Sequence, residues 1–181
     1  MTAEPTAVVP LDLPLSTSEG VPVALASVLG HRLTIVQLVR YFGCLPCQEW
    51  LVHLDRAADE LGRQDVGAIA IGGSADYQAR WLREEKGVGL PLLLDPEHRF
   101  RGHVGASDAL GWRLLDPRGA TAYARSLTNG FRPQRITRDT ARSPGVVVLD
   151  STGTVRWRHI GTRIGHYPAL EEVRTAVGRL R

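Results

Sequence analysis

The stretch "LTIVQLVRYFGCLPCQEW", residues 33–50, decides the fold of this 181-residue chain. Its first half is a nearly continuous run of β-branched and aliphatic side chains, which is the pattern of a strand buried on both faces. After Gly43, apolar residues recur at three- and four-residue spacing, which predicts a helix that ends near Gly62. Both cysteines of the chain, Cys44 and Cys47, stand at the junction of the predicted strand and helix.

Hydrophobic runs and helical patterns alternate along the rest of the chain, which predicts a parallel or mixed sheet with helices on its faces. The further strands are expected at residues 66–73, 90–95, 145–150 and 154–161. A helix is expected between the first two of these strands, and a Gly-containing turn marks a hairpin between the last two. The chain ends with a predicted helix from about Ala169 to Arg179.

This order of elements is that of the thioredoxin superfamily. We therefore expect one α/β domain over residues 1–181, with a central mixed β-sheet flanked by helices. Two additions to that plan are expected: an N-terminal extension over about 1–32 and an insertion over about 105–142, before the C-terminal hairpin. The insertion is expected to be mostly loop, with one short helix at "TAYARSLTNG" (121–130).

Composition places the chain among ordinary globular proteins, with 43% hydrophobic and 23% charged residues. It has no apolar run of the roughly 18 residues that a membrane span needs, and its N-terminus lacks the basic and apolar regions of a signal peptide. We therefore expect a cytoplasmic protein without a membrane partner. In the cytoplasm a structural disulfide is rare, so a lone CxxC is expected to be reactive or metal-binding.

Positive charge is concentrated in residues 113–142, which hold seven arginines against two aspartates, while the whole chain carries a net charge of only +3. Such a segment is either a solvated surface or a region that attracts an acidic substrate or partner. No motif repeats as in an RNA-binding module, so a nucleic-acid partner is not expected.

The CxxC at a strand–helix junction has a specific chemistry. Cys44 would lie at the helix N-terminus, where unpaired N–H groups and the helix dipole stabilise the attacking thiolate. Cys47 would lie one turn further on, close enough to form a disulfide with Cys44. Pro46 fits the first helical turn, where a missing N–H costs little. Arg40 either lowers the pKa of Cys44 or is an exposed arginine at the end of the strand.

Two other interpretations of the cysteines are weaker. A structural zinc site needs four ligands, but the chain has no third cysteine and no closely spaced histidine pair of the HxxxH type. Inert buried cysteines are typical of isolated positions rather than of a CxxC that begins a helix. We therefore expect neither a metal nor a cofactor.

Two segments resemble the peroxiredoxin-like branch of the AhpC/TSA family, within the thioredoxin superfamily: "VALASVLGHRLTIVQLVRYFGCLPCQEW" (23–50) and "LPLLLDPEHRFRGHVG" (90–105). A third, "SPGVVVLDSTGTVRWRHIG" (143–161), resembles the hairpin of the thioredoxin-like disulfide reductases, including its proline. The resemblance implies a thioredoxin-like fold and thiol-based redox chemistry. It also implies a cis bond between Ser143 and Pro144, beside the CxxC, where the neighbouring backbone binds an extended substrate.

The chain departs from the family pattern at several positions. The proline and threonine that precede the peroxidatic cysteine of a peroxiredoxin are Gln37 and Tyr41 here, and the active-site arginine falls at Pro144, with Arg142 two residues away. The tryptophan that precedes the first cysteine of a thioredoxin is Gly43. The sequence therefore matches neither a standard peroxiredoxin nor a standard thioredoxin.

The first functional hypothesis is a thiol–disulfide oxidoreductase in which Cys44 attacks a disulfide and Cys47 resolves the mixed disulfide. Pro144 would shape the substrate groove, and Gly43 would leave room beside Cys44. The expected partners are a disulfide-containing protein, a small thiol or a peroxide, together with a thiol reductant as electron donor. The chain itself is expected to be a monomer or a homodimer.

The alternatives use the same cysteines in other ways. In a thiol peroxidase, a peroxide oxidises Cys44 to a sulfenic acid, which condenses with Cys47. In a redox sensor or adaptor, disulfide formation changes the affinity for a partner. In a specialised small-molecule redox enzyme, the insertion builds a pocket for an acidic substrate, and Arg125, Arg132 and Arg135 bind it.

Overall fold

The computed structural model describes residues 7–73 and 75–180 and contains a seven-stranded mixed sheet with five α-helices among those residues. The sheet order is β2-β1-β5-β4-β3-β6-β7. The strands are β1 (Pro14–Thr17), β2 (Pro22–Ala24), β3 (Leu33–Leu38), β4 (Val66–Gly72), β5 (Leu92–Leu94), β6 (Gly145–Asp150) and β7 (Val155–Ile160). The helices are α1 (Leu45–Arg63), α2 (Asp76–Lys86), α3 (Arg99–His103), α4 (Pro117–Thr128) and α5 (Leu170–Arg179). The predicted thioredoxin-like fold is confirmed.

Strand β3 is the centre of the sheet, and all six of its residues are buried. It pairs in parallel with β4 and antiparallel with β6. The strand ends three residues earlier than predicted because its ladder with β6 stops at the pair Leu38–Gly145. The next residues turn away from the sheet, so Arg40 and Tyr41 belong to the loop that leads into α1.

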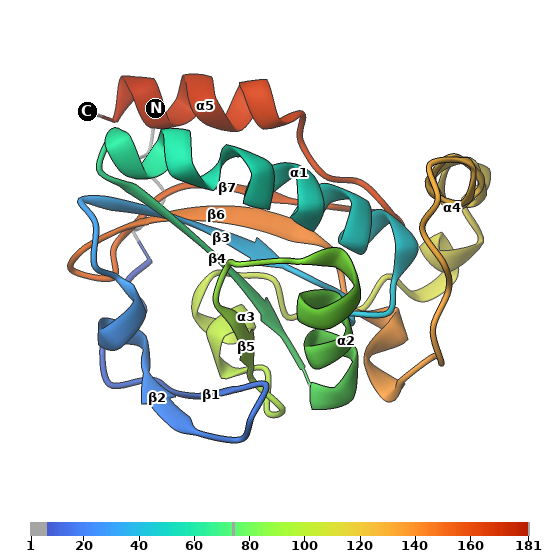
Figure 1. Cartoon of the computed structure of the whole chain (residues 1–181), viewed down its shortest axis with the longest axis horizontal. Helices are drawn as coiled ribbons and strands as arrows, with labels where there is room; N and C mark the ends of the chain where they lie inside the picture. Colours follow the sequence, from blue (N-terminus) through green and yellow to red (C-terminus); the bar gives the residue numbers. More distant parts are fainter. Residues whose placement is uncertain (1–6, 74, 181) are drawn as a thin grey trace.

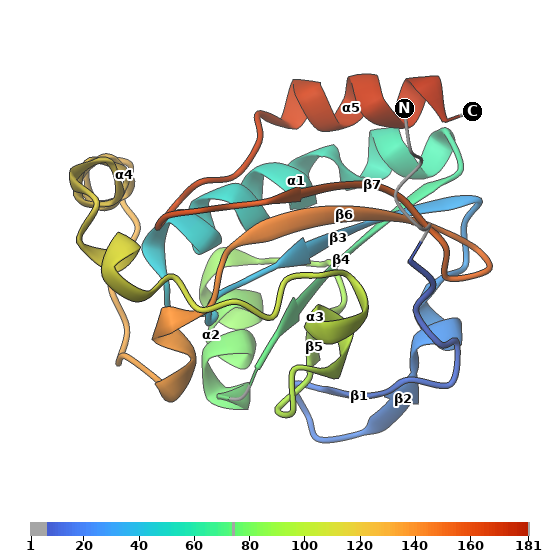
Figure 2. The ribbon, with the colours of Figure 1, turned by 180° about the vertical axis from the view of Figure 1, so that it is seen from behind.

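Two hydrophobic clusters cover the two faces of the sheet. The first joins buried residues of α1, α2 and α5 to alternate positions of β3, β4 and β6, and Figure 1 shows α1 and α5 stacked on this face. The second joins the other positions of these strands to α3 and the N-terminal segment, and α3 lies on the opposite side of the sheet in Figure 2. Covering both faces explains the continuous apolar runs in the strand sequences.

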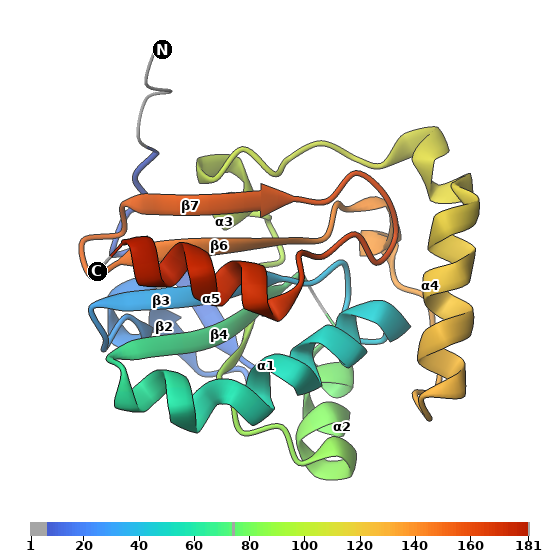
Figure 3. The same cartoon turned by 90° about the horizontal axis from the view of Figure 1, so that it is seen from above.

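The insertion contains more helix than predicted. The helix α4 has 12 residues and begins at Pro117, and two short 3₁₀ turns lie at Gly111–Leu115 and Arg138–Ala141. The earlier start follows from local chemistry, because the Asp116 carboxylate accepts a hydrogen bond from the Arg118 N–H and Pro117 occupies the first turn. Figure 3 shows α4 beyond the end of the sheet, beside the start of α1.

The N-terminal extension adds the edge of the sheet. Strand β1 pairs antiparallel with both β2 and β5, so the N-terminal extension predicted from the sequence contributes two strands. No helix in the part of the chain that the structure describes is long and apolar enough to cross a membrane.

Candidate active site

Both cysteines lie where the sequence predicts, at the start of α1, and both are free thiols. Cys44 is the N-cap residue of the helix, and Pro46 stands in its first turn. The side chains are enclosed, because Cys44 is 0% and Cys47 1% exposed. Any reagent larger than a few atoms therefore needs the surrounding segments to move before it reaches either sulfur.

Arg40 is buried beside the dithiol rather than exposed at the end of a strand. It is 1% exposed, and its Nη1 lies 3.6 Å from the Cys44 sulfur. Its Nη2 donates to the Thr140 carbonyl, which belongs to the 3₁₀ turn Arg138–Ala141 of the insertion. The guanidinium therefore places a positive charge next to the two sulfurs and also holds the insertion over them.

The two thiols share one favourable negative charge. Burial acts to raise the pKa of Cys47, but it is outweighed by the hydrogen bond from the Cys44 thiol, the charge of Arg40 and the hydrogen bond from Tyr167, which lower this pKa to about 6. Burial, and then the adjacent Cys47 sulfur, raise the pKa of Cys44 well above its ordinary value. The two sulfurs therefore titrate as a coupled pair that shares one proton through a hydrogen bond, and Arg40 favours a single negative charge on this pair.

Two side chains position Cys47 from outside the CxxC. Gln37, on β3, donates through its Nε2 to the Cys47 carbonyl at 3.0 Å. Tyr167 donates through its hydroxyl to the Leu38 carbonyl at 3.0 Å, and the same hydroxyl contributes to the lowered pKa of Cys47. Sequence reasoning missed Tyr167, because it is 120 residues distant in the chain and no local motif marks it.

Gly43 packs directly against two glutamine side chains. A Cβ at this position would lie 2.7 Å from the Gln78 Nε2 and 2.9 Å from the Gln134 Cβ. The Gly43 N–H donates to the Gln78 Oε1 at 3.0 Å, and the Gln78 Nε2 donates to the Arg135 carbonyl at 2.7 Å. The absence of a side chain at Gly43 thus lets the insertion close over the first cysteine, instead of leaving an open space there for a substrate.

The insertion also forms hydrogen bonds to α1 and to the loop that leads into it. The Tyr41 and Tyr123 hydroxyls lie 3.0 Å apart. The buried Glu49 carboxylate accepts hydrogen bonds from Ser126 at 2.7 Å and from Asn129 at 2.6 Å. These contacts explain why α4 stays against the start of α1 although it lies beyond the sheet.

The family model described as "AhpC/TSA family" matches residues 7–158 of the chain. The chain belongs to the AhpC/TSA family. This membership confirms the resemblance seen in the sequence and makes the protein a thiol-based redox enzyme of the peroxidase or oxidoreductase kind. No curated protein matches the chain.

Solved structures share the fold of this AhpC/TSA protein at low sequence identity. A cysteine-to-serine variant of Xanthomonas campestris peroxiredoxin Q is 15% identical with a TM-score of 0.68, covering 98% of this chain and 100% of that chain. The peroxidoxin BcpB of Mycobacterium tuberculosis is 12% identical with a TM-score of 0.69, covering 98% and 99%. A peroxiredoxin-like protein of Aquifex aeolicus is 12% identical with a TM-score of 0.65, covering 99% and 88%.

The predicted cis bond between Ser143 and Pro144 is wrong, because this peptide bond is trans in the AhpC/TSA protein. The Ser143 carbonyl accepts a hydrogen bond of 2.7 Å from Nη1 of Arg101, whose Nη2 donates to the Val39 carbonyl at 2.6 Å. Arg101 is 2% exposed, and burial lowers its pKa to about 10. The backbone that was expected to bind an extended substrate therefore accepts a hydrogen bond from a buried arginine, which the sequence analysis did not identify.

Arg142 does not stand beside the cysteines. Its Nη1 donates to the Ser107 carbonyl at 3.1 Å, and the neighbouring Ser143 hydroxyl donates to the Asp108 carbonyl at 3.2 Å. Both residues tie the two ends of the insertion together. Arg40 is the arginine in contact with the Cys44 sulfur, and the buried Arg101 also interacts electrostatically with Cys47. No group of three or more metal-ligating side chains is present among the described residues.

Proposed function

We infer that this enzyme is a thiol peroxidase that reduces hydroperoxides with Cys44 and Cys47 as its redox couple. The observation that carries the proposal is the complete burial of both sulfurs beside Arg40. A peroxide group is small enough to enter such a site after a small opening, whereas a protein disulfide needs a groove beside the first cysteine. The Arg101 contacts and the closed insertion take the place of that groove.

The position of Cys44, at the N-cap of α1 and 3.6 Å from the Arg40 guanidinium, supports it as the attacking sulfur. Cys44 passes its proton to the Cys47 thiolate, and the Cys44 sulfur attacks the terminal oxygen of the hydroperoxide. An S–O bond forms and the O–O bond breaks, so Cys44 becomes a sulfenic acid. The departing alkoxide takes the proton from Cys47, which is then a thiolate again. Arg40 stabilises the negative charge throughout this exchange.

Cys47 then resolves the intermediate. Its thiolate attacks the sulfenic sulfur of Cys44, the S–S bond forms, and the hydroxide that leaves is protonated to water. The two sulfurs lie one helical turn apart, so the bond closes within α1. A thiol reductant supplied from outside returns two electrons by disulfide exchange and restores the dithiol.

A thiol–disulfide oxidoreductase remains the second candidate, because the CxxC at a helix N-terminus suits disulfide exchange equally well. Stopped-flow tryptophan fluorescence separates the two, since Trp50 lies in the same helix as both cysteines. The reduced protein is mixed with hydrogen peroxide, with an organic hydroperoxide, or with a protein disulfide such as that of insulin.

The peroxidase proposal predicts reaction with a hydroperoxide at least about 100-fold faster than with the protein disulfide. It also predicts loss of the peroxide phase in Cys44→Ser and a slower first phase in Cys47→Ser, which lacks the sulfur that accepts the Cys44 proton. The matched control is Ser143→Ala, which alters no proposed reacting group. A faster reaction with the disulfide, abolished in Cys44→Ser, contradicts the peroxidase and supports the oxidoreductase.

A further inference from the structure

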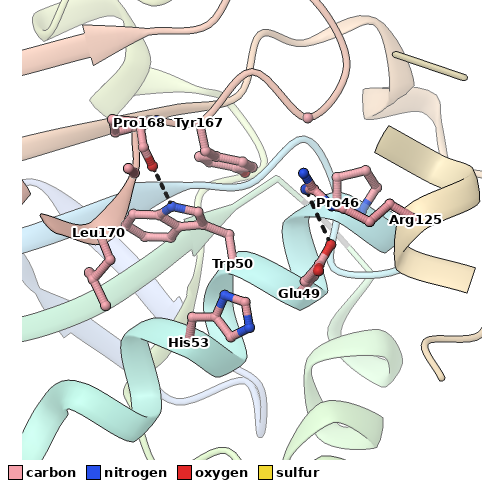
Figure 4. A pocket seen from close by; sticks show the side chains of 10 residues that line it. Pro46, Glu49, Trp50, His53, Arg125, Tyr167, Pro168 and Leu170 are labelled. Atoms are coloured by element: carbon pink, nitrogen blue, oxygen red, sulfur yellow. Dashed lines mark hydrogen bonds and ion pairs between the residues drawn. The ribbon is translucent and has the colours of Figure 1, made fainter. Parts of the chain in front are cut away.

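A cavity of about 510 Å³ lies between α1, α4 and the segment that leads into α5. Its volume falls in the range of small-molecule binding sites, about 300–1,000 Å³. Figure 4 shows Pro46 and Arg125 on one side and Leu170 on the other, with Trp50 and Tyr167 between them. Pro46 lies between the two cysteines in the chain and lines the cavity, whereas neither cysteine is among the lining residues.

The wall between these two ends is aromatic and fixed in position. The Trp50 and Tyr167 rings are stacked, with centroids 5.2 Å apart and an interplanar angle of 19°. The Trp50 Nε1 donates to the Pro168 carbonyl at 2.9 Å, which fixes the orientation of the indole. Leu170 and Pro46 add aliphatic surface. The aromatic part of the lining is therefore held in place before a ligand binds, and it suits a flat or aliphatic ligand body.

One end of the cavity carries positive charge that is open to a ligand. The Arg125 side chain is 63% exposed, and its Nη2 contacts the Glu49 Oε2 at a long 3.4 Å. The Glu49 carboxylate is already bound by Ser126 and Asn129 at shorter distances. The Arg125 guanidinium can therefore donate to an incoming carboxylate or sulfonate, because Glu49 has its stronger hydrogen bonds to Ser126 and Asn129. The exposed His53 lines the same cavity.

The opposite end of the cavity is formed by two apolar residues at the start of α5, Ala169 and Leu170. This arrangement favours a single orientation, in which the anionic group of a ligand faces α4 and its apolar body lies along the aromatic wall towards α5.

We propose that this cavity binds an amphipathic organic anion, with its carboxylate on Arg125 and its apolar body against Trp50 and Tyr167. The Tyr167 ring then separates the ligand from Cys47. This binding does not rest on the proposed peroxidase function.

The test uses 2-naphthoate as the probe and its neutral analogue, 2-naphthylmethanol, as the matched control ligand. Affinity is measured by calorimetry with the reduced full-length protein, and the Trp50 indole N–H resonance is followed by NMR. We expect naphthoate to shift this resonance and to bind about tenfold more tightly than the alcohol, as expected for one charge-assisted hydrogen bond.

Two exposed arginines of α4 provide the variant and its control. Arg125→Gln is expected to weaken naphthoate about tenfold and to leave the alcohol unchanged. Arg118→Gln, on the same helix but outside the cavity lining, is expected to change neither by more than about twofold. Equal affinity for the two ligands, an unmoved Trp50 resonance, or an equal loss in both variants overturns the site. Cys44→Ser is expected to bind naphthoate normally, so failure of the peroxidase proposal and failure of this site give different results.

Discussion

Replacing Arg40 by methionine is expected to raise the pKa of the dithiol strongly. The Arg40 Nη1 lies 3.6 Å from the Cys44 sulfur in a buried site. At an effective dielectric constant of about 20, Coulomb's law gives an interaction of about 4–5 kcal/mol at this separation. For a negative charge at the Cys44 sulfur this energy corresponds to about 3 pH units, and the charge of Arg40 also lowers the pKa of Cys47.

The hydrogen bonds from Cys44 and Tyr167 to the Cys47 sulfur remain in this variant. We therefore expect the midpoint of thiolate formation to rise by about 2 units rather than by the full Coulomb value. At pH 7 the wild-type dithiol is mostly ionised and that of the variant is mostly protonated. The rate of reaction with hydrogen peroxide at pH 7 is therefore expected to fall at least about tenfold.

The assay is the thiolate absorbance near 240 nm as a function of pH, with the oxidised protein as the blank. Arg40→Lys keeps the charge and is the matched control, with an expected midpoint within about 1 unit of wild type. Circular dichroism verifies that each variant is folded. A folded Arg40→Met protein whose midpoint stays within about half a unit of wild type refutes the electrostatic role of Arg40.

Three further predictions concern stability. Gly43→Ala is expected to lower the free energy of unfolding by about 1–3 kcal/mol in urea unfolding, because the added Cβ meets Gln78. Gly62→Ala is the control, because a Cβ there lies in open space within α1, and this variant is expected to be as stable as wild type or more stable. The reduced protein is expected to gain stability as pH rises from about 6 to 9, because unfolded Cys47 binds a proton throughout that window and folded Cys47 does not; melting temperatures that stay parallel to those of the oxidised protein contradict this. Glu49→Ala is expected to lower the free energy of unfolding by about 1–3 kcal/mol, because it removes the acceptor of the hydrogen bonds from Ser126 and Asn129. Amide hydrogen exchange in α4 that is no faster than in wild type contradicts this role of Glu49.

The junction of β3 and α1 was predictable because its signals are local. A run of buried residues is sufficient to identify a central strand, and the periodicity after Gly43 is sufficient to identify the helix. The CxxC was found for the same reason. The helix α4 was only partly predicted, although Asp116 and Pro117 form an ordinary helix start.

The surroundings of the dithiol were less predictable, because they are built from distant segments. Tyr167 and Arg101 reach the site from different elements, and neither belongs to a motif. The resemblance to thioredoxin-like hairpins predicted the wrong isomer before Pro144, and the backbone there is bound by Arg101, which no local motif marks. The role of Arg40 was open in the sequence, since a strand-end arginine is buried or exposed according to what packs over it.

The most direct test of the proposed chemistry is to locate the sulfenic acid. Reduced Cys47→Ser is treated with one equivalent of hydrogen peroxide in the presence of dimedone, and the tryptic peptide 41–56 is examined by mass spectrometry. The account predicts a stoichiometric dimedone adduct on Cys44, formed at the rate of the fluorescence change, and no comparable adduct in Cys44→Ser. An adduct that forms on Cys47 in Cys44→Ser at the wild-type rate, with none on Cys44 in Cys47→Ser, contradicts the assignment of Cys44 as the attacking sulfur.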